Sequence, residues 1–188
     1  MAILFERLIR HRGTEYRIVA DLDDAAIGDG ALRVTIQASV RSLPDGPWLE
    51  EALDLVVDLT RSLVEVVVKG RVIATVPFTL PLADSADFLG NDIDVIVDDG
   101  VIEHAMGAHG IEALIHLIPA DPFIGCIVKS AVSTAIGQII RCWRSAPKGG
   151  PMSQLTHDIG SCLREHGLRM ALTFLYRAGR CAVLVGMG

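Results

Sequence analysis

The stretch from Asp121 to Arg144, DPFIGCIVKSAVSTAIGQIIRCWR, constrains the fold more than any other part of the chain. Asp followed by Pro is typical of a helix start, because the carboxylate accepts an otherwise unpaired backbone N–H and proline has none to leave unpaired. Apolar residues then recur at steps of three and four and give one broad face: Ile124, Val128, Ala131, Val132, Ala135, Ile136, Ile139, Ile140 and Trp143. A helix of about 24 residues is roughly 36 Å long, enough to cross a small domain. We therefore predict a long central helix against which a sheet packs.

The residues that precede this helix contain most of the strand signals. Apolar and polar side chains alternate over 31–41 and, less strictly, over 14–24, which predicts two antiparallel strands with one solvated face. Lys69-Gly70 predicts the turn of a hairpin within 63–80, and Pro77 near its end indicates an edge strand or a strand end. The predicted class is α+β: an antiparallel sheet packed on a long central helix (about 121–144), with additional flanking helices. At 188 residues the chain suits one domain over 1–188.

The flanking elements follow from shorter patterns. Residues 92–97 read as a strand, and SAPKGGP at 145–151 reads as a flexible linker before a C-terminal helix and hairpin. Apolar spacing and helix-ending Gly or Pro residues predict four more helices, over 2–10, 48–63, 110–117 and 152–167, the last stopped by Gly167. Residues 168–177 fit a helix and a strand equally well. We favour a hairpin there, with its turn at Ala178-Gly179 and CAVLVG as a strand.

Charge is unevenly distributed along this acidic protein, which has a net charge of −6. Residues 1–120 hold 9 Lys and Arg against 20 Asp and Glu, whereas residues 121–188 hold 8 against 3. The two parts could neutralise one another in the fold, or the basic part could face an anionic partner. Aromatic residues make up only 5% and no strongly basic patch is present, so we do not expect a nucleic-acid partner.

The cysteines and the N-terminus bear on location. Cys126, Cys142, Cys162 and Cys181 form no C-x-x-C pair and lie in apolar or helical contexts, which favours buried thiols in a reducing cytoplasm. Charged residues interrupt the apolar start of the chain, which disfavours a signal peptide. No run of 18 uncharged apolar residues is present, so no transmembrane segment is expected.

Two groups of residues are candidate metal sites. On a helix, His109, Glu112 and His116 lie at steps of three and four and share a face, so their side chains could ligate Zn²⁺ or another divalent metal. The alternative is that Gly107 and Gly110 interrupt the helix and leave these residues apart.

Carboxylates at predicted strand ends form the second group. Asp21 and Asp23 end one predicted strand, and Asp98 and Asp99 follow another. This arrangement resembles the haloacid dehalogenase superfamily of phosphatases. The resemblance implies Asp21 as nucleophile, Asp23 as acid/base, Asp98 and Asp99 as ligands of Mg²⁺, and Lys69 as the phosphate-binding lysine. A metal-dependent, phosphatase-like hydrolase is therefore one alternative function; the other interpretation is that Asp-rich turns only solvate the strand ends.

The function that we favour from sequence is association without catalysis. The chain is rich in core-forming residues and poor in convergent polar sets, so we expect a non-enzymatic cytoplasmic protein, without a cofactor, that acts through self-association or binding to a protein partner. Small residues along the long helix suit either a core or a subunit interface. The apolar end of the chain suggests a strand that pairs with its own sheet or with a neighbouring subunit. The expected partner surface is Lys129, Arg141, Arg144 and Lys148. A further alternative is peripheral membrane binding through the basic, apolar C-terminal third.

Overall fold

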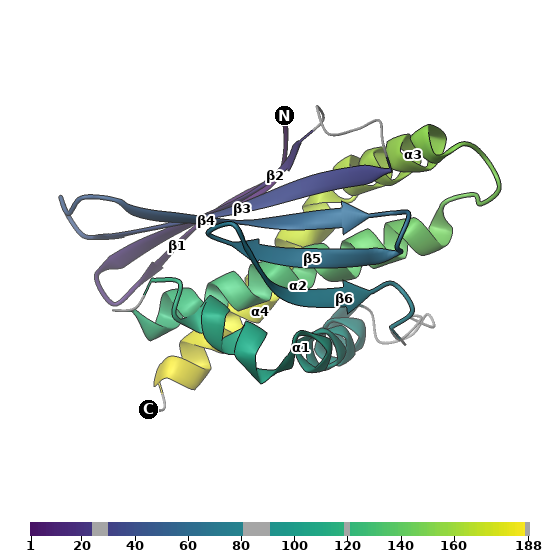
Figure 1. The fold of residues 1–188 in the computed structure, drawn as a ribbon. Coiled ribbons are helices and arrows are strands. Elements are labelled where there is room, and N and C mark those ends of the chain that lie inside the picture. The colour runs from purple at the N-terminus through teal and green to yellow at the C-terminus, as the bar shows by residue number, and fades with distance from the viewer. Residues whose placement is uncertain (24–29, 81–90, 119–120, 187–188) are drawn as a thin grey trace.

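Six antiparallel strands, each paired with the next in the chain, form one sheet in the order β1-β2-β3-β4-β5-β6 (Figure 1). The computed structural model describes residues 1–23, 30–80, 91–118 and 121–186, and for 91–99 and 185–186 it describes the backbone only. The strands are β1 (Ala2–His11), β2 (Thr14–Asp23), β3 (Ala31–Ser42), β4 (Leu49–Asp58), β5 (Leu63–Val68) and β6 (Arg71–Pro77). The predicted strands over 14–24 and 31–41 and their antiparallel pairing are confirmed.

Two tight turns connect strands at the ends of this sheet. Arg12 and Gly13 join β1 to β2, and Lys69 and Gly70 join β5 to β6. All four residues have positive φ, between 48° and 75°, which is the pattern of the type I′ hairpin turn. The predicted turn at Lys69-Gly70 is confirmed. Gly13, which follows the helix predicted over 2–10, belongs to a hairpin turn.

The helices predicted over 2–10 and 48–63 are both wrong, because these segments form β1 and β4. In β1 the pairing with β2 shifts between Ile3 and Phe5, so Leu4 and Phe5 are both buried and the alternation is broken. In β4 the buried residues do alternate, but Val56 on the other face is also apolar and completes a helical spacing. In each strand, one apolar residue outside the strict alternation produced a false helical pattern.

One face of the sheet is covered by helices and the other is not. The buried face carries residues such as Ile18, Val34 and Leu55, each fully buried. The four helices lie on that side (Figure 1): α1 (Asn91–Ile115), α2 (Pro122–Ser145), α3 (Met152–Glu165) and α4 (Gly167–Gly186). α1 packs against β6 and α4 against β1, the two edge strands, while α2 lies between them against β2 and β3. The predicted α+β class, with the sheet packed on a long central helix, is confirmed.

The structure corrects the prediction for two more segments. Residues 92–97, predicted as a strand, lie in α1, which has a kink at Gly107 where φ is 71°. The C-terminal segment, for which we favoured a hairpin and a CAVLVG strand, is the single helix α4. The helix predicted over 152–167 is confirmed as α3, which ends at Glu165, and Gly167 begins the next helix. A Cβ at Gly167 would stand 2.4 Å from the carbonyl oxygen of Leu4, so glycine is required for α4 to approach β1.

The start of α2 is tied directly to the sheet. The Asp121 side chain accepts hydrogen bonds from the backbone N–H groups of Phe123 and Ile124, at 2.9 and 3.3 Å, which confirms it as the N-cap. Its other carboxylate oxygen accepts a hydrogen bond of 2.8 Å from the hydroxyl of Tyr16 on β2. Burial raises the pKa of Tyr16, and the bond to Asp121 raises this pKa further. One side chain therefore caps the central helix and fixes it to the sheet.

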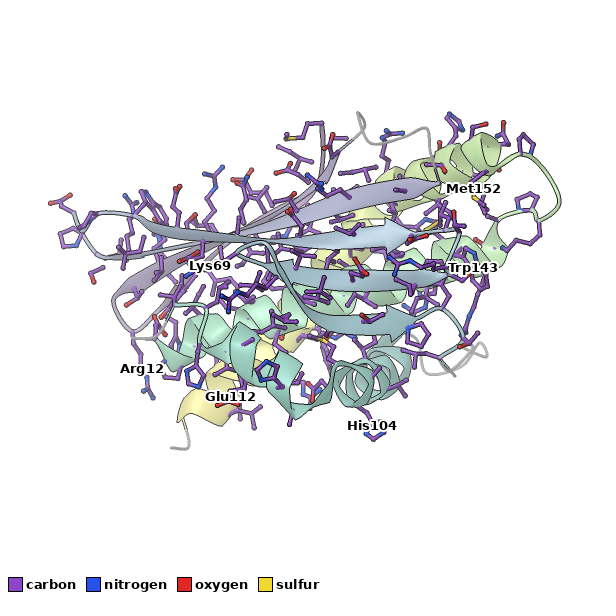
Figure 2. All side chains as sticks on the ribbon, viewed as in Figure 1. Arg12, Lys69, His104, Glu112, Trp143 and Met152 are labelled. Atoms are coloured by element: carbon purple, nitrogen blue, oxygen red, sulfur yellow. A yellow bond between two sulfur atoms is a disulfide. The ribbon has the colours of Figure 1, made fainter. Side chains whose placement is uncertain are left out.

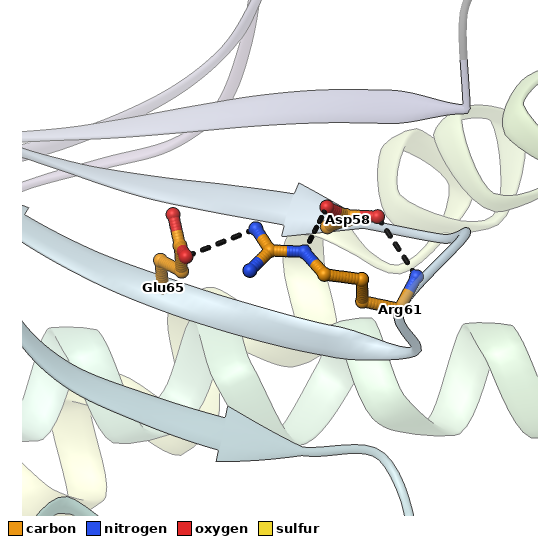
Figure 3. A network of polar contacts seen from close by, with 3 residues as sticks. All are labelled: Asp58, Arg61 and Glu65. Carbon is orange, nitrogen blue, oxygen red and sulfur yellow. Dashed lines mark hydrogen bonds and ion pairs between the residues drawn. The ribbon is translucent and has the colours of Figure 1, made fainter.

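The β4–β5 turn is held by a small polar network (Figure 3). Asp58 accepts hydrogen bonds from the backbone N–H and the guanidinium of Arg61, and the same guanidinium contacts Glu65 at 3.0 Å. The backbone and side-chain hydrogen bonds from Arg61 lower the pKa of Asp58. Because Arg61 is exposed, this network shapes the turn and contributes little to stability.

α2 alone among the described helices is long and apolar enough to cross a bilayer by length and composition. However, 89% of its most apolar window is buried inside the fold. Core helices that are almost wholly buried commonly have such a composition, so α2 is weak evidence for a membrane span. The small residues Gly125, Ala131 and Gly137 are all buried here, and a Cβ at Gly125 would stand 2.6 Å from the carbonyl oxygen of Ile115. The small residues of α2 therefore serve the core.

Candidate functional site

The outer side of α4 is an exposed apolar surface. We define the α4 apolar face as Leu168, Leu172, Leu175, Tyr176 and Val183. Their exposed fractions run from 38% for Leu175 to 69% for Leu168. Steps of three, four and seven residues place these side chains along one side of the helix. Exposed apolar groups gathered on one element, in contrast to scattered ones, mark interaction sites.

The other side of α4 is also apolar, because it supplies part of the core. Met170, Phe174 and Cys181 are buried at 1%, 0% and 1% exposure, and Phe174 stacks on Phe5 of β1 with ring centroids 5.5 Å apart. α4 is thus apolar on two sides but covered on one. In the sequence, Arg169, Thr173 and Arg177 fit helical and strand spacing equally, so the exposed apolar side of the helix was not recognised.

Gly179 lies within the α4 apolar face and leaves a gap there. A Cβ built at Gly179 would meet nothing within 4 Å. Arg169 and Arg180 border the face on one side, as their positions along the helix require. α4 contains no Asp or Glu. The face is therefore an apolar strip with a gap near its middle and a basic margin.

The four cysteines form two disulfides, Cys126–Cys181 and Cys142–Cys162, which overturns the expectation of buried free thiols. The first joins α2 to α4 and the second joins α2 to α3. Helical spacing in the sequence did not show this pairing, because all four partners come from helices whose packing was unknown. The cytoplasmic location stays a prediction, although disulfides are typical of oxidising compartments.

His166 lies beside the second disulfide. Its Nδ1 is 3.7 Å from Cys162 Sγ and 2.8 Å from the carbonyl oxygen of Cys162. Cys142, Cys162 and His166 form the only group of three or more Cys, His, Asp or Glu in the described residues whose ligand atoms all lie within 4.8 Å of one another. The signal in the sequence was the step of four from Cys162 to His166, one helical turn.

The predicted group of His109, Glu112 and His116 lies on the exposed side of α1. Glu112 and His116, with His104, line a groove of about 510 Å³ along α1 at the Gly107 kink. Figure 2 shows His104 and Glu112 on the side of α1 that faces away from the sheet. The ligand atoms of His109, Glu112 and His116 do not gather within 4.8 Å of one another, so the structure gives this set no preformed metal geometry.

The four candidate carboxylates do not all lie at strand ends. Asp21 lies in β2 between the fully buried Ala20 and Leu22, so its side chain is on the opposite face, away from the helices. Asp23, two residues on, shares that face. Burial raises the pKa of Asp21, and the nearby Glu6 raises it further. The backbone of Asp98 and Asp99 belongs to α1, which lies on the helical side of the sheet, and not to a strand.

The predicted partner surface is largely engaged within the chain. Lys129 forms an ion pair with Glu103 at 3.0 Å, and Arg144 donates hydrogen bonds to the carbonyl oxygens of Phe78 and Leu80. Lys148 donates to the carbonyl oxygens of Trp143 and Ala146 and lies 4.6 Å from the centre of the Trp143 ring. Arg141 also has an interaction within the chain. All four cations therefore have contacts within the chain.

Comparison with protein-family models, with curated proteins and with solved structures gave no match for this chain. Its function is therefore inferred from the surface and the side-chain groups described above.

Proposed function

We propose that the protein is a non-enzymatic association module whose binding surface is the α4 apolar face, and that its partner is a second copy of the same chain. The observation that supports this most strongly is the exposure of five large apolar side chains along one helix. Complete burial of such a side chain stabilises by about 1.5–3 kcal/mol, so a surface that covers all five gains a part of this from each.

The shape of the face suits pairing with itself. Large side chains lie on both sides of Gly179, with Leu175 and Tyr176 before it and Val183 after it. In an antiparallel pair of α4 helices, side chains of each helix would enter the gap at Gly179 of the other. Such a two-fold contact uses the same surface on both subunits, which is the commonest form of soluble oligomer.

The size of the face sets the expected strength of this dimer. A 20-residue helix is about 30 Å long and, with side chains, about 10 Å wide, so one side of α4 offers about 300 Å². This area is well below the roughly 800 Å² that each partner buries in a standard interface. We therefore expect a weak, reversible dimer whose population rises with protein concentration.

A second candidate function is peripheral binding to an anionic membrane surface. The observation in its favour is charge: α4 has no acidic residue, Arg169 and Arg180 border its apolar face, and residues 121–188 hold five more basic than acidic side chains, 8 against 3. Apolar side chains beside arginines are typical of helices that lie in the membrane interface. A basic margin would weaken self-pairing slightly, since the two helices would bring like charges together.

A pair of variants tests the proposal. We expect the wild-type protein to show a concentration-dependent mass between monomer and dimer in light scattering, and Leu172→Glu with Val183→Glu to be monomeric at every concentration. The control is Leu49→Glu on β4, because Leu49 is as exposed as Leu172, at 58%, but lies outside the face. A wild-type protein that is monomeric throughout contradicts self-association. A double Glu variant that still dimerises contradicts the α4 apolar face as the dimer surface.

Neutralisation of the basic margin separates the two candidates. Arg169→Gln with Arg180→Gln should leave the dimer intact or strengthen it, because it removes like charges from the pair. The same change should abolish flotation with phosphatidylserine-containing vesicles if the face binds membranes. Monomeric protein that floats only with anionic vesicles, and only with both arginines present, would establish the second candidate in place of the first.

A further inference from the structure

We infer that Cys142, Cys162 and His166 form a zinc site when the Cys142–Cys162 disulfide is reduced. The inference is independent of the association through α4, since its residues belong to α2 and to the end of α3. It starts from the observation that a histidine ring nitrogen lies 3.7 Å from one sulfur of the disulfide.

The three residues have the types and the spacing that zinc requires. Thiolate sulfur and imidazole nitrogen are the preferred ligands of structural zinc, at about 2.3 and 2.0–2.1 Å. Two such ligands at the tetrahedral angle stand about 3.6 Å apart by these bond lengths. Cys162 Sγ and His166 Nδ1 are already at 3.7 Å. This edge of the coordination tetrahedron is therefore in place before any metal binds.

The surroundings also favour a bound cation. Cys142 is in the last turn of α2, and Cys162 and His166 are at the end of α3, so the partial negative charge of two helix C-termini lies nearby and outweighs the single N-terminus of α4 at Gly167. Cys142 is buried at 1% exposure, while Cys162 and His166 are half-buried. The site is thus closed on one side and open on the other. We expect three protein ligands and one water, with the water on the open side.

The change of state balances in electrons and protons. A dithiol reductant supplies two electrons and two protons, the bond between Cys142 Sγ and Cys162 Sγ breaks, and the reductant is left as a disulfide. Zn²⁺ then displaces the two thiol protons, which pass to solvent, and binds two thiolates and a neutral imidazole. In the oxidised protein His166 Nδ1–H donates to the carbonyl oxygen of Cys162. When zinc binds, this hydrogen bond breaks and the ring proton moves through solvent to Nε2, so the neutral imidazole binds the metal through Nδ1.

The second disulfide provides a natural control. Cys126–Cys181 has Ser130 as its polar neighbour, with Ser130 Oγ 3.6 Å from Cys181 Sγ, and no histidine joins these sulfurs in a described ligand group. After reduction this pair lacks a third strong ligand. Only the Cys142–Cys162 pair would exchange a covalent link for a metal link, so the connection between α2 and α3 would persist under reducing conditions.

The test uses the full chain, a phosphine reductant and Zn²⁺ alone. We expect one equivalent of zinc per chain in the reduced wild-type protein and none in the oxidised protein, measured by equilibrium dialysis with metal analysis. Cys126→Ser with Cys181→Ser should still bind one equivalent. His166→Ala should weaken binding at least tenfold, whereas His157→Ala, an exposed histidine of the same helix, should leave the affinity unchanged.

The zinc test remains valid if the reduced protein unfolds. In that case zinc should restore the helical circular dichroism of the wild-type protein but not that of His166→Ala. The inference is overturned if reduced protein binds no zinc and is not refolded by it. It is also overturned if His166→Ala binds as tightly as the wild type, or if the loss of Cys126 and Cys181 abolishes binding.

Discussion

α2 and α4 are both long helices made mostly of apolar residues, and the Cys126–Cys181 disulfide joins them, but they have opposite surroundings. α2 lies between the sheet and the other helices and is buried on nearly every side. α4 is covered by β1 and α2 on one side and exposes Leu168, Leu172 and Val183 on the other. The composition of a helix therefore does not tell how many of its sides the fold covers. An apolar side left uncovered is the more informative one for function.

The largest expected effect concerns the link between the two helices. The Cys126–Cys181 disulfide closes a separation of 55 residues, which corresponds to about 4 kcal/mol of stabilisation on the chain-entropy model; the separation of 20 between Cys142 and Cys162 corresponds to about 3 kcal/mol. We expect Cys126→Ser with Cys181→Ser to lower the free energy of unfolding in urea more than Cys142→Ser with Cys162→Ser. Hydrogen exchange should rise in α4 first, because only one side of α4 is packed. Equal exchange in α2 and α4 would contradict the contrast between them.

The next prediction compares the loss of unfolding free energy at one buried and one exposed position. Ile136 on α2 is fully buried, so Ile136→Ala should cost about 2–5 kcal/mol in the free energy of unfolding. Leu172 on α4 is 58% exposed, and Leu172→Ala should change this free energy by less than about 0.5 kcal/mol. Both are measured by urea denaturation at a protein concentration where the chain is monomeric. A loss at Leu172 comparable to that at Ile136 would mean that the α4 apolar face is covered within the monomer.

The centre of the fold could be predicted from the sequence, whereas β1 and α4 could not, for physical reasons. α2 was predictable because its cap, Asp121, and its apolar spacing are both local signals, and the β5–β6 turn because Lys69-Gly70 specifies it. β1 was not predictable, since the register shift near Leu4 that breaks its alternation depends on pairing with β2. α4 was ambiguous because Arg169, Thr173 and Arg177 fit both helical and strand spacing.

The candidate sites were predictable only where the signal was local. Cys162 and His166 are one helical turn apart, and this closeness could be read from spacing once a helix was assumed. Their pairing with Cys142 could not, because it depends on how α3 packs against α2. Asp21 and Asp98 were grouped by the assumption that both ended strands, and the structure places Asp98 in a helix on the other side of the sheet.

The smallest expected effect concerns how α2 begins. Asp121→Ala removes the acceptor of the Phe123 and Ile124 backbone N–H groups and that of the Tyr16 hydroxyl, so it should cost about 0.5–2 kcal/mol as a lost cap, with the lost hydrogen bond in addition. Asp121→Asn is the matched control, because asparagine caps about as well and keeps one oxygen for the N–H groups. Tyr16→Phe removes only the link to the sheet and should cost about 0.5–1.5 kcal/mol or somewhat more, since the acceptor is charged. A double-mutant cycle on urea unfolding measures their coupling. If Asp121→Ala and Tyr16→Phe are fully additive, Asp121 caps α2 but does not fix it to the sheet, and the burial of α2 would then rest on its apolar packing alone.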